Sequence, residues 1–70
     1  MRNKILILGA NPETVPLVKK AKEKGLITFV IGKEKNNAAK QIADYPIIGD
    51  ASNVEFVSQL IKKNKINALM

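Results

Sequence analysis

Several residue types that carry chemistry in proteins are missing or scarce in this chain. There is no cysteine, which excludes disulfides and thiolate metal sites. There is no histidine, which removes the usual general base, the commonest zinc ligand and any Ser-His catalytic triad. Aromatic residues make up only 4%, so few side chains are available to stack on nucleic-acid bases. What remains open is the binding of phosphates or other anions.

Long apolar segments are absent as well. The run 5–8 (ILIL) follows a short basic start, as in a signal peptide, but the turn-forming residues 9–13 end it too early. It is also much shorter than the ~20 residues that span a bilayer. We therefore expect a cytoplasmic protein that does not enter a membrane.

Size and charge describe a small basic domain. Seventy residues make one domain at most, near the size at which a single core only just sustains folding. Lys and Arg outnumber Asp and Glu by 12 to 6, which gives a net charge of +6. We expect the lysines on the solvent faces and last turns of helices, interspersed with Glu23 and Glu34. The excess charge is therefore interpreted as a solvated basic face, with no nucleic-acid partner, although such a face attracts anions at long range.

The hydrophobic pattern alternates between strand and helix periods along the chain. Apolar stretches predict strands at 4–8, 26–31, 45–48 and 66–70. Helical spacing predicts helices from between Glu13 and Val15 to Gly25, over 38–43, and from a capping box of Ser52 and Glu55 to the lysines at 62–65. This order predicts a three-layer, Rossmann-like α/β fold, βαβαβαβ, with a parallel four-stranded sheet in the order 3-2-1-4.

The fourth predicted strand has an open outer side. It carries Leu69 and Met70, and nothing follows that would cover this edge, which makes it prone to pairing with another chain. We therefore expect residues 1–70 to be a fragment of a longer protein, or this edge to be covered by a second copy.

Ligands of open α/β sheets bind at the carboxyl ends of the strands, near the point where the strand order reverses. The residues predicted to line that edge are Gly9, Ala10, Asn11, Pro12, Glu13, Lys33 and Asp50. A glycine permits a tight turn there, and free amides at the start of the following helix can hold an anion. The alternative is that Gly9 serves only the turn between strand and helix.

The known phosphate-binding motifs are incomplete. A dinucleotide fingerprint needs glycines where this chain has Asn11 and Thr14, and the acidic residue expected after the second strand is replaced by Gly32 and Lys33. A P-loop is excluded, because Lys33 is followed by glutamate and the upstream glycine is missing.

Paired carboxylates are a further possibility for chemistry. Asp50 together with Asp44 or Glu55 can be imagined as a magnesium site. The predicted capping box explains Glu55, however, and the turn before the helix explains Asp50. No metal site is therefore predicted.

Four segments together resemble the N-terminal domain of ATP-grasp enzymes, and most of all that of carbamoyl-phosphate synthase large-subunit-like proteins and related carboxylate-amine ligases. They are 4–12 (KILILGANP), 15–25 (VPLVKKAKEKG), 43–45 (ADY) and 65–69 (KINAL). The resemblance implies that 1–70 form a pre-ATP-grasp domain, a Rossmann-like unit that precedes the nucleotide-binding domains and helps shape the substrate side of the active site.

The resemblance also implies an activity for the parent enzyme. Such ligases use ATP and magnesium to activate a small carboxylate as an acyl phosphate, which an amine then attacks. In the family the loop after the first strand contributes to the substrate site, which corresponds here to 9–12. The chain departs from the family where Asn11 replaces a second glycine, and where Gly32 and Lys33 replace an acidic residue.

The ATP-binding lysines, glycine-rich lid and magnesium carboxylates of the family belong to later domains. The chain alone is therefore expected to hold no cofactor and to be inactive. The implied partners are the remaining ATP-grasp domains, or a second copy, through the fourth strand. One alternative function is a small Rossmann-like regulatory module that binds a nucleotide or phosphate at the Gly9 loop. Another is a purely structural domain that packs on a partner through its fourth strand.

Overall fold

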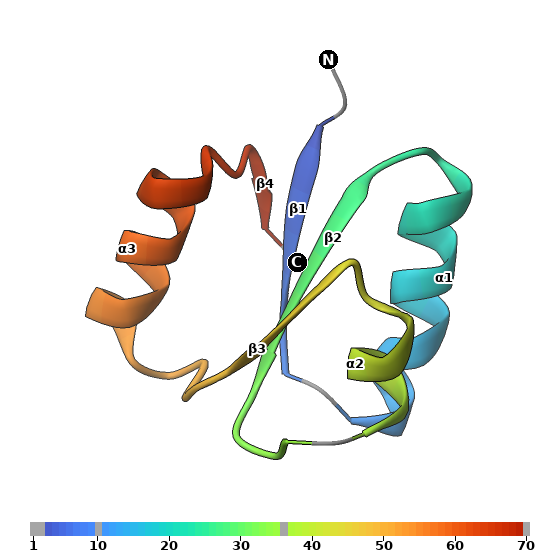
Figure 1. The fold of residues 1–70 in the computed structure, drawn as a ribbon, viewed down its shortest axis with the longest axis horizontal. Helices are drawn as coiled ribbons and strands as arrows, with labels where there is room; N and C mark the ends of the chain where they lie inside the picture. Colours follow the sequence, from blue (N-terminus) through green and yellow to red (C-terminus); the bar gives the residue numbers. More distant parts are fainter. Residues whose placement is uncertain (1–2, 10, 36, 70) are drawn as a thin grey trace.

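The fold is a parallel sheet between two helical layers. The computed structural model describes residues 3–9, 11–35 and 37–69. Its elements are β1 (Lys4–Leu8), a 3-10 turn η1 (Pro12–Thr14), α1 (Val15–Glu23), β2 (Ile27–Gly32), α2 (Ala38–Ile42), β3 (Tyr45–Ile48), α3 (Val54–Asn64) and β4 (Ala68–Leu69). The strands are all parallel, in the order β3-β2-β1-β4. Helices α1 and α2 cover one face and α3 covers the other (Figure 1). The predicted three-layer Rossmann-like fold and strand order are thus confirmed.

The two inner strands, β1 and β2, contribute side chains to both hydrophobic layers. This explains why apolar and polar residues do not alternate along them. Side chains on one face of β1 and β2 pack with α1 and α2, and those on the other face pack with α3. The first layer contains Ile5, Ile7, Val18, Ala21, Val30 and Ala39. The second contains Leu6, Phe29, Ile31, Val57 and Ile66. The register, in which Leu6 lies beside Phe29, keeps residues of the same layer adjacent across the two strands.

Helix α1 begins and ends where the sequence predicts. Asn11 and Thr14 form a reciprocal capping box around the 3-10 turn, and the α-helix proper starts at Val15. Pro16 lies in the first turn, where its missing N–H needs no partner. After the helix, Gly25 adopts a φ of 80°, which a glycine tolerates and other residues rarely do.

The start of α3 differs from the prediction. The expected capping box of Ser52 and Glu55 is not formed, because the N-cap is Asn53, whose side-chain oxygen accepts a hydrogen bond from the Phe56 amide at 3.1 Å. The Ser52 hydroxyl instead donates to Asp50 Oδ1 at 2.7 Å. The helix therefore begins one residue later than a serine cap requires.

Two strands are shorter or shifted relative to the prediction. Strand β2 starts at Ile27, not at residue 26, and extends to Gly32. Strand β4 comprises only Ala68–Leu69 of the predicted 66–70, and Met70 lies outside the described residues. The cause is at the end of α3, where the amide of Ile66 donates to Ile61 O and ties Ile66, which is buried, to the helix end.

The helices are short. Helix α1 has 9 residues and α3 has 11. Across the described ranges, none of the helices combines the length and apolar character needed to cross a bilayer.

Candidate functional site

Three loops meet at the carboxyl edge of the sheet, as predicted. Backbone hydrogen bonds extend the ladder beyond the strands: the Gly9 amide donates to Ile31 O at 3.0 Å, and the Gly49 amide donates to Gly32 O at 2.9 Å. The segments that follow β1, β2 and β3 therefore start side by side, at the lower end of the sheet in Figure 1. Of the predicted site residues, Ala10 lies outside the described residues.

The loop after β1 uses its polar groups internally. Gly9 has a φ of 90°, so a glycine is required for this turn. The Asn11 side-chain oxygen accepts from the Glu13 amide at 3.0 Å, and the Asn11 carbonyl accepts from the Thr14 amide at 3.0 Å. The Val15 amide donates to Pro12 O, and proline has no amide to offer. The amides expected to hold an anion are thus already hydrogen-bonded.

Lys33 and Asp50 form an exposed pair across the loops after β2 and β3. The Lys33 Nζ lies 3.8 Å from Asp50 Oδ2. Ser52 donates to Asp50 Oδ1 from its hydroxyl at 2.7 Å and from its amide at 2.9 Å. These hydrogen bonds, assisted by the charge of Lys33, hold the pKa of Asp50 below its ordinary value. The edge therefore presents a fixed anion beside a more exposed cation.

Lys40 holds the loop that carries Lys33. Its Nζ donates to Gly32 O at 2.7 Å and also to Glu34 O, and only 4% of the residue is exposed. The expectation that the lysines lie on solvent faces is therefore wrong for Lys40. Its ammonium donates to both the Gly32 and the Glu34 carbonyl in the turn after β2. Without it, these carbonyls would need water as a hydrogen-bond donor. Nothing in its sequence neighbourhood distinguishes it from the exposed lysines.

The carboxylates considered for a metal are not gathered at one place. Asp44 precedes β3 and Asp50 follows it, so the two lie at opposite ends of that strand. Asp44 Oδ2 accepts from the Thr28 amide at 2.9 Å and from the Thr28 hydroxyl at 3.0 Å, which explains it as a structural residue. In the part of the chain that the structure describes, no three acidic side chains cluster as a metal site would require.

The fold and its loops define a Rossmann-like α/β domain whose polar candidate residues lie at the carboxyl edge of the sheet. Comparison of the chain with models of protein families gives no match, and neither does comparison with curated proteins. Asn11, Lys33 and Glu13 are all exposed, so the edge is an open surface and not a closed pocket. An open edge of this kind can contact one side of a small molecule.

Proposed function

We propose that the chain is the substrate-side N-terminal domain of an ATP-grasp ligase, in which the Gly9 loop, Lys33 and Asp50 contact a small carboxylate substrate. Two observations support the proposal: the resemblance of four segments to that domain, and the strand order that aligns the loops after β1, β2 and β3. The observation that carries it is the Lys33 ammonium at this edge, which is exposed although it lies 3.8 Å from Asp50 Oδ2, and which is held on a loop anchored by Lys40.

The alternative, a module that binds phosphate or a nucleotide, is less well supported. An anion site at the Gly9 loop needs free amides, but the amides of Glu13, Thr14 and Val15 already have acceptors. The exposed carboxylate of Asp50, 3.8 Å from the ammonium of Lys33, would also repel a polyanion more strongly than a single carboxylate.

The proposal assigns ATP and magnesium to other domains of such an enzyme. The chain's own donor set does not suit them, because the described residues contain no acidic cluster for a metal and the amides of Glu13, Thr14 and Val15 already have acceptors. The role of Lys33 is to orient the substrate carboxylate by charge, and the Gly9 amide, which donates to Ile31 O, begins its loop beside the end of β2. The chain alone is expected to release no phosphate from ATP.

The test is an NMR titration of the whole 70-residue chain, labelled with ¹⁵N, using acetate, L-glutamate, inorganic phosphate and ADP as probes. We expect the two carboxylates to shift the amides of Gly9, Lys33 and Asp50, with dissociation constants on the order of millimolar, as a small ligand at an open site allows.

Two variants of the same loop make the test specific. Lys33→Gln should abolish the shifts, whereas Lys35→Gln, a matched change at a second exposed lysine, should leave them unchanged. Shifts produced by phosphate and ADP but not by carboxylates would support the regulatory module instead. If none of the probes shifts these amides, or if Lys35→Gln acts like Lys33→Gln, the proposed site is wrong.

A further inference from the structure

The outer side of β4 is an open strand edge. On its inner side β4 pairs with β1, with Ala68 beside Ile5 and Leu69 beside Leu6. β4 is the last strand in the order β3-β2-β1-β4, so no other strand of the described chain pairs with its outer side. Leu69 is 56% exposed although its partner Leu6 is completely buried. An open edge with an exposed leucine is a template for an added strand.

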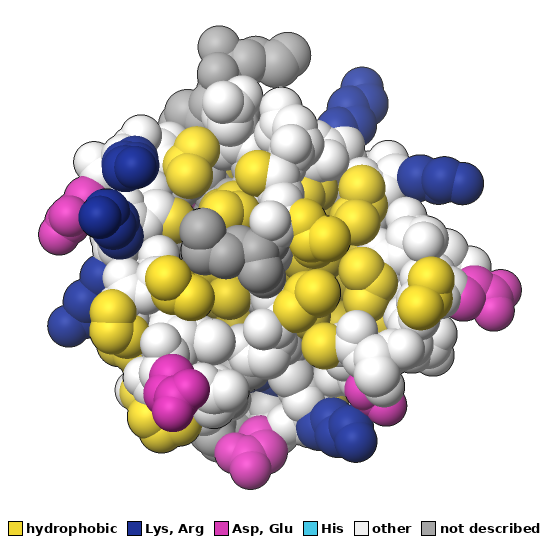
Figure 2. Space-filling view, turned by 180° about the vertical axis from the view of Figure 1, so that it is seen from behind, with side chains coloured by type: hydrophobic (Ala, Val, Ile, Leu, Met, Phe, Trp, Pro, Cys, Tyr) yellow, Lys and Arg dark blue, Asp and Glu magenta, His cyan; other side chains and the backbone are white. Residues whose placement is uncertain are grey.

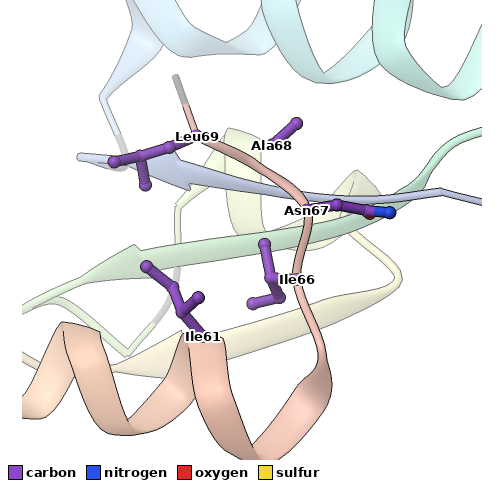
Figure 3. A pocket seen from close by; sticks show the side chains of 5 residues that line it. All are labelled: Ile61, Ile66, Asn67, Ala68 and Leu69. Carbon is purple, nitrogen blue, oxygen red and sulfur yellow. The ribbon is translucent and has the colours of Figure 1, made fainter.

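Apolar recesses flank this edge on both faces of the sheet. On the α1 face a groove of about 340 Å³ is lined by Ile5, Leu17, Lys20, Ala21, Lys24 and Leu26. On the α3 face a recess of about 180 Å³ is lined by Ile61, Ile66, Asn67, Ala68 and Leu69. Figure 3 shows Ile61 and Ile66 on the side of α3, and Ala68 pointing to the opposite side. The edge thus offers one apolar recess to each face of an incoming strand.

Leu17 is the clearest sign that the α1 face is incompletely covered. Its spacing in α1 places it on the face expected to be buried, yet it is 39% exposed, whereas Val18 beside it is fully buried. Helix α1 packs over β2 and against α2, which leaves the part of the sheet beyond β1 without a helix on this face.

The rim of these recesses is basic. Lys20 and Lys24 line the groove on the α1 face, and Lys65, which is exposed, directly precedes Ile66 on the other. Figure 2, which views the molecule from behind, shows a band of hydrophobic side chains with basic side chains beyond its upper left and upper right, whereas acidic side chains lie at its outer left and right margins and below it. With a net charge of +6 on the whole chain, the edge favours an acidic partner over a neutral or basic one.

We propose that β4 is the docking edge for an extended segment of a partner protein, with apolar residues in its centre and Asp or Glu at its ends. Such a segment adds as a strand through backbone hydrogen bonds to β4. Because successive side chains of a strand point to opposite faces, alternate residues enter the groove beside Leu17 and the recess beside Ile66. The acidic ends then lie near Lys20, Lys24 and Lys65.

A second copy of the chain is a poorer occupant. Pairing two β4 strands would bring the lysine rims of two chains, each with a net charge of +6, toward one another. A segment with acidic ends places opposite charges there instead.

The test compares two nine-residue peptides with the same centre, Val-Ile-Val-Ile-Val, flanked at both ends by Glu-Glu or by Lys-Lys. Each is titrated into the ¹⁵N-labelled 70-residue chain at low ionic strength. We expect the acidic peptide to shift the amides of Ala68 and Leu69 and to bind about tenfold more tightly than the basic one. Tenfold corresponds to about 1.4 kcal/mol, the summed contribution of a few exposed charge pairs.

Charge reversal supplies the control. The double variant Lys20→Glu, Lys24→Glu changes two exposed side chains of α1 and should bring the two peptides to within about threefold of each other. The matched double variant Lys19→Glu, Lys35→Glu makes the same charge change at two exposed lysines that line neither recess, and should preserve the preference for the acidic peptide.

Several outcomes would overturn the proposal. They are equal binding of both peptides, shifts at the outer edge of β3 in place of β4, or self-association of the chain through Leu69 that neither peptide displaces. If anionic phospholipid vesicles slow the hydrogen exchange of the Leu69 amide and neither peptide binds, the edge contacts a membrane surface and the proposed protein partner is wrong. The proposal does not rest on the function suggested for the Gly9 loop, because Lys33 and Asp50 line neither recess beside β4.

Discussion

The two outer strands of the sheet begin alike and end differently. Asp44 precedes β3 and Asn67 precedes β4, and each places a side-chain oxygen on a backbone amide of the adjacent inner strand. Asp44 Oδ2 accepts from the Thr28 amide at 2.9 Å, and Asn67 Oδ1 accepts from the Lys4 amide at 2.8 Å. The same kind of hydrogen bond, from an inner-strand amide to a side-chain oxygen, therefore precedes the pairing of each outer strand.

Beyond this shared start, the strands diverge. Four residues of β3 pair with β2, the rings of Phe29 and Tyr45 stack with centroids 4.8 Å apart, and Gly49 extends the ladder. Only Ala68–Leu69 of β4 pair with β1. Contacts within the chain therefore hold β3 to its inner neighbour over twice as many paired residues as β4, although both outer strands leave apolar side chains exposed, Tyr45 and Ile48 on β3 and Leu69 on β4.

The largest effect on stability is expected from removing the side-chain acceptor that precedes β3. Asp44→Ala leaves the buried Thr28 amide and hydroxyl without their acceptor and should lower the free energy of unfolding by about 3 kcal/mol. Asn67→Ala affects an amide nearer to solvent and should cost about 1 kcal/mol or less. Urea denaturation measures both.

Asp44→Asn keeps an oxygen acceptor and serves as the variant that still folds if Asp44→Ala does not. It should recover at least half of the lost stability. Equal losses of unfolding free energy in Asp44→Ala and Asn67→Ala would show that the two side-chain hydrogen bonds contribute equally and would contradict this prediction.

The end of β3 gives the next largest effect. A Cβ added at Gly49 would overlap the ring of Phe56, so Gly49→Ala should cost about 2 kcal/mol through overpacking. Gly25→Ala is the control, because no atom lies within 4 Å of its Cβ position and only its φ of 80° opposes the substitution, at about 1 kcal/mol. If Phe56→Leu does not relieve the cost of Gly49→Ala in thermal unfolding, the contact with the ring is not the cause.

A lysine placed on each outer strand should also have different effects on stability. Leu69→Lys changes a side chain that is already 56% exposed and should alter stability by less than about 0.5 kcal/mol. Ile47→Lys replaces a residue of β3 that packs against the α3 layer and should cost more than about 1 kcal/mol. Chemical denaturation of the two variants tests this, and a large loss in Leu69→Lys would mean that the edge of β4 is packed after all.

The smallest effect concerns the turn after β3. The hydrogen bonds from Ser52 hold the pKa of Asp50 below its ordinary value, and Lys33 assists. A folded-state pKa below the unfolded one means that the contribution to stability is present above the unfolded pKa. It is lost as the pH falls through the folded pKa. NMR titration of the Asp50 carboxyl carbon should show a higher pKa in Ser52→Ala and a smaller rise in Lys33→Gln. A larger rise in Lys33→Gln would contradict this order of causes.

Much of the fold is readable from the sequence because local signals agree with one another. The unalternating run of β1 predicts a strand buried on both faces, and the helical spacing of α1 up to Gly25 predicts its crossover. Such consistent signals predict the strand order, and they also predict that the Gly9 loop, Lys33 and Asp50 share one edge.

What the sequence did not predict depends on competition between neighbouring polar groups. Ser52 fits a serine cap, but its hydroxyl is engaged by Asp50, so Asn53 caps α3. Asn11 caps the start of the helix with the geometry of a serine capping box. The sequence signal for this cap is an asparagine followed three residues later by a threonine. The burial of Lys40 depends on two carbonyls that only the folded turn brings together.

That burial makes Lys40 a built-in reporter of motion. Reagents that acylate amines react rapidly with accessible side chains, and the ammonium of Lys40 is shielded between α2 and the turn after β2. Its labelling therefore requires that turn to open, so the rate at which Lys40 is modified, relative to Lys35 in the same loop, measures how often the turn opens in the native protein.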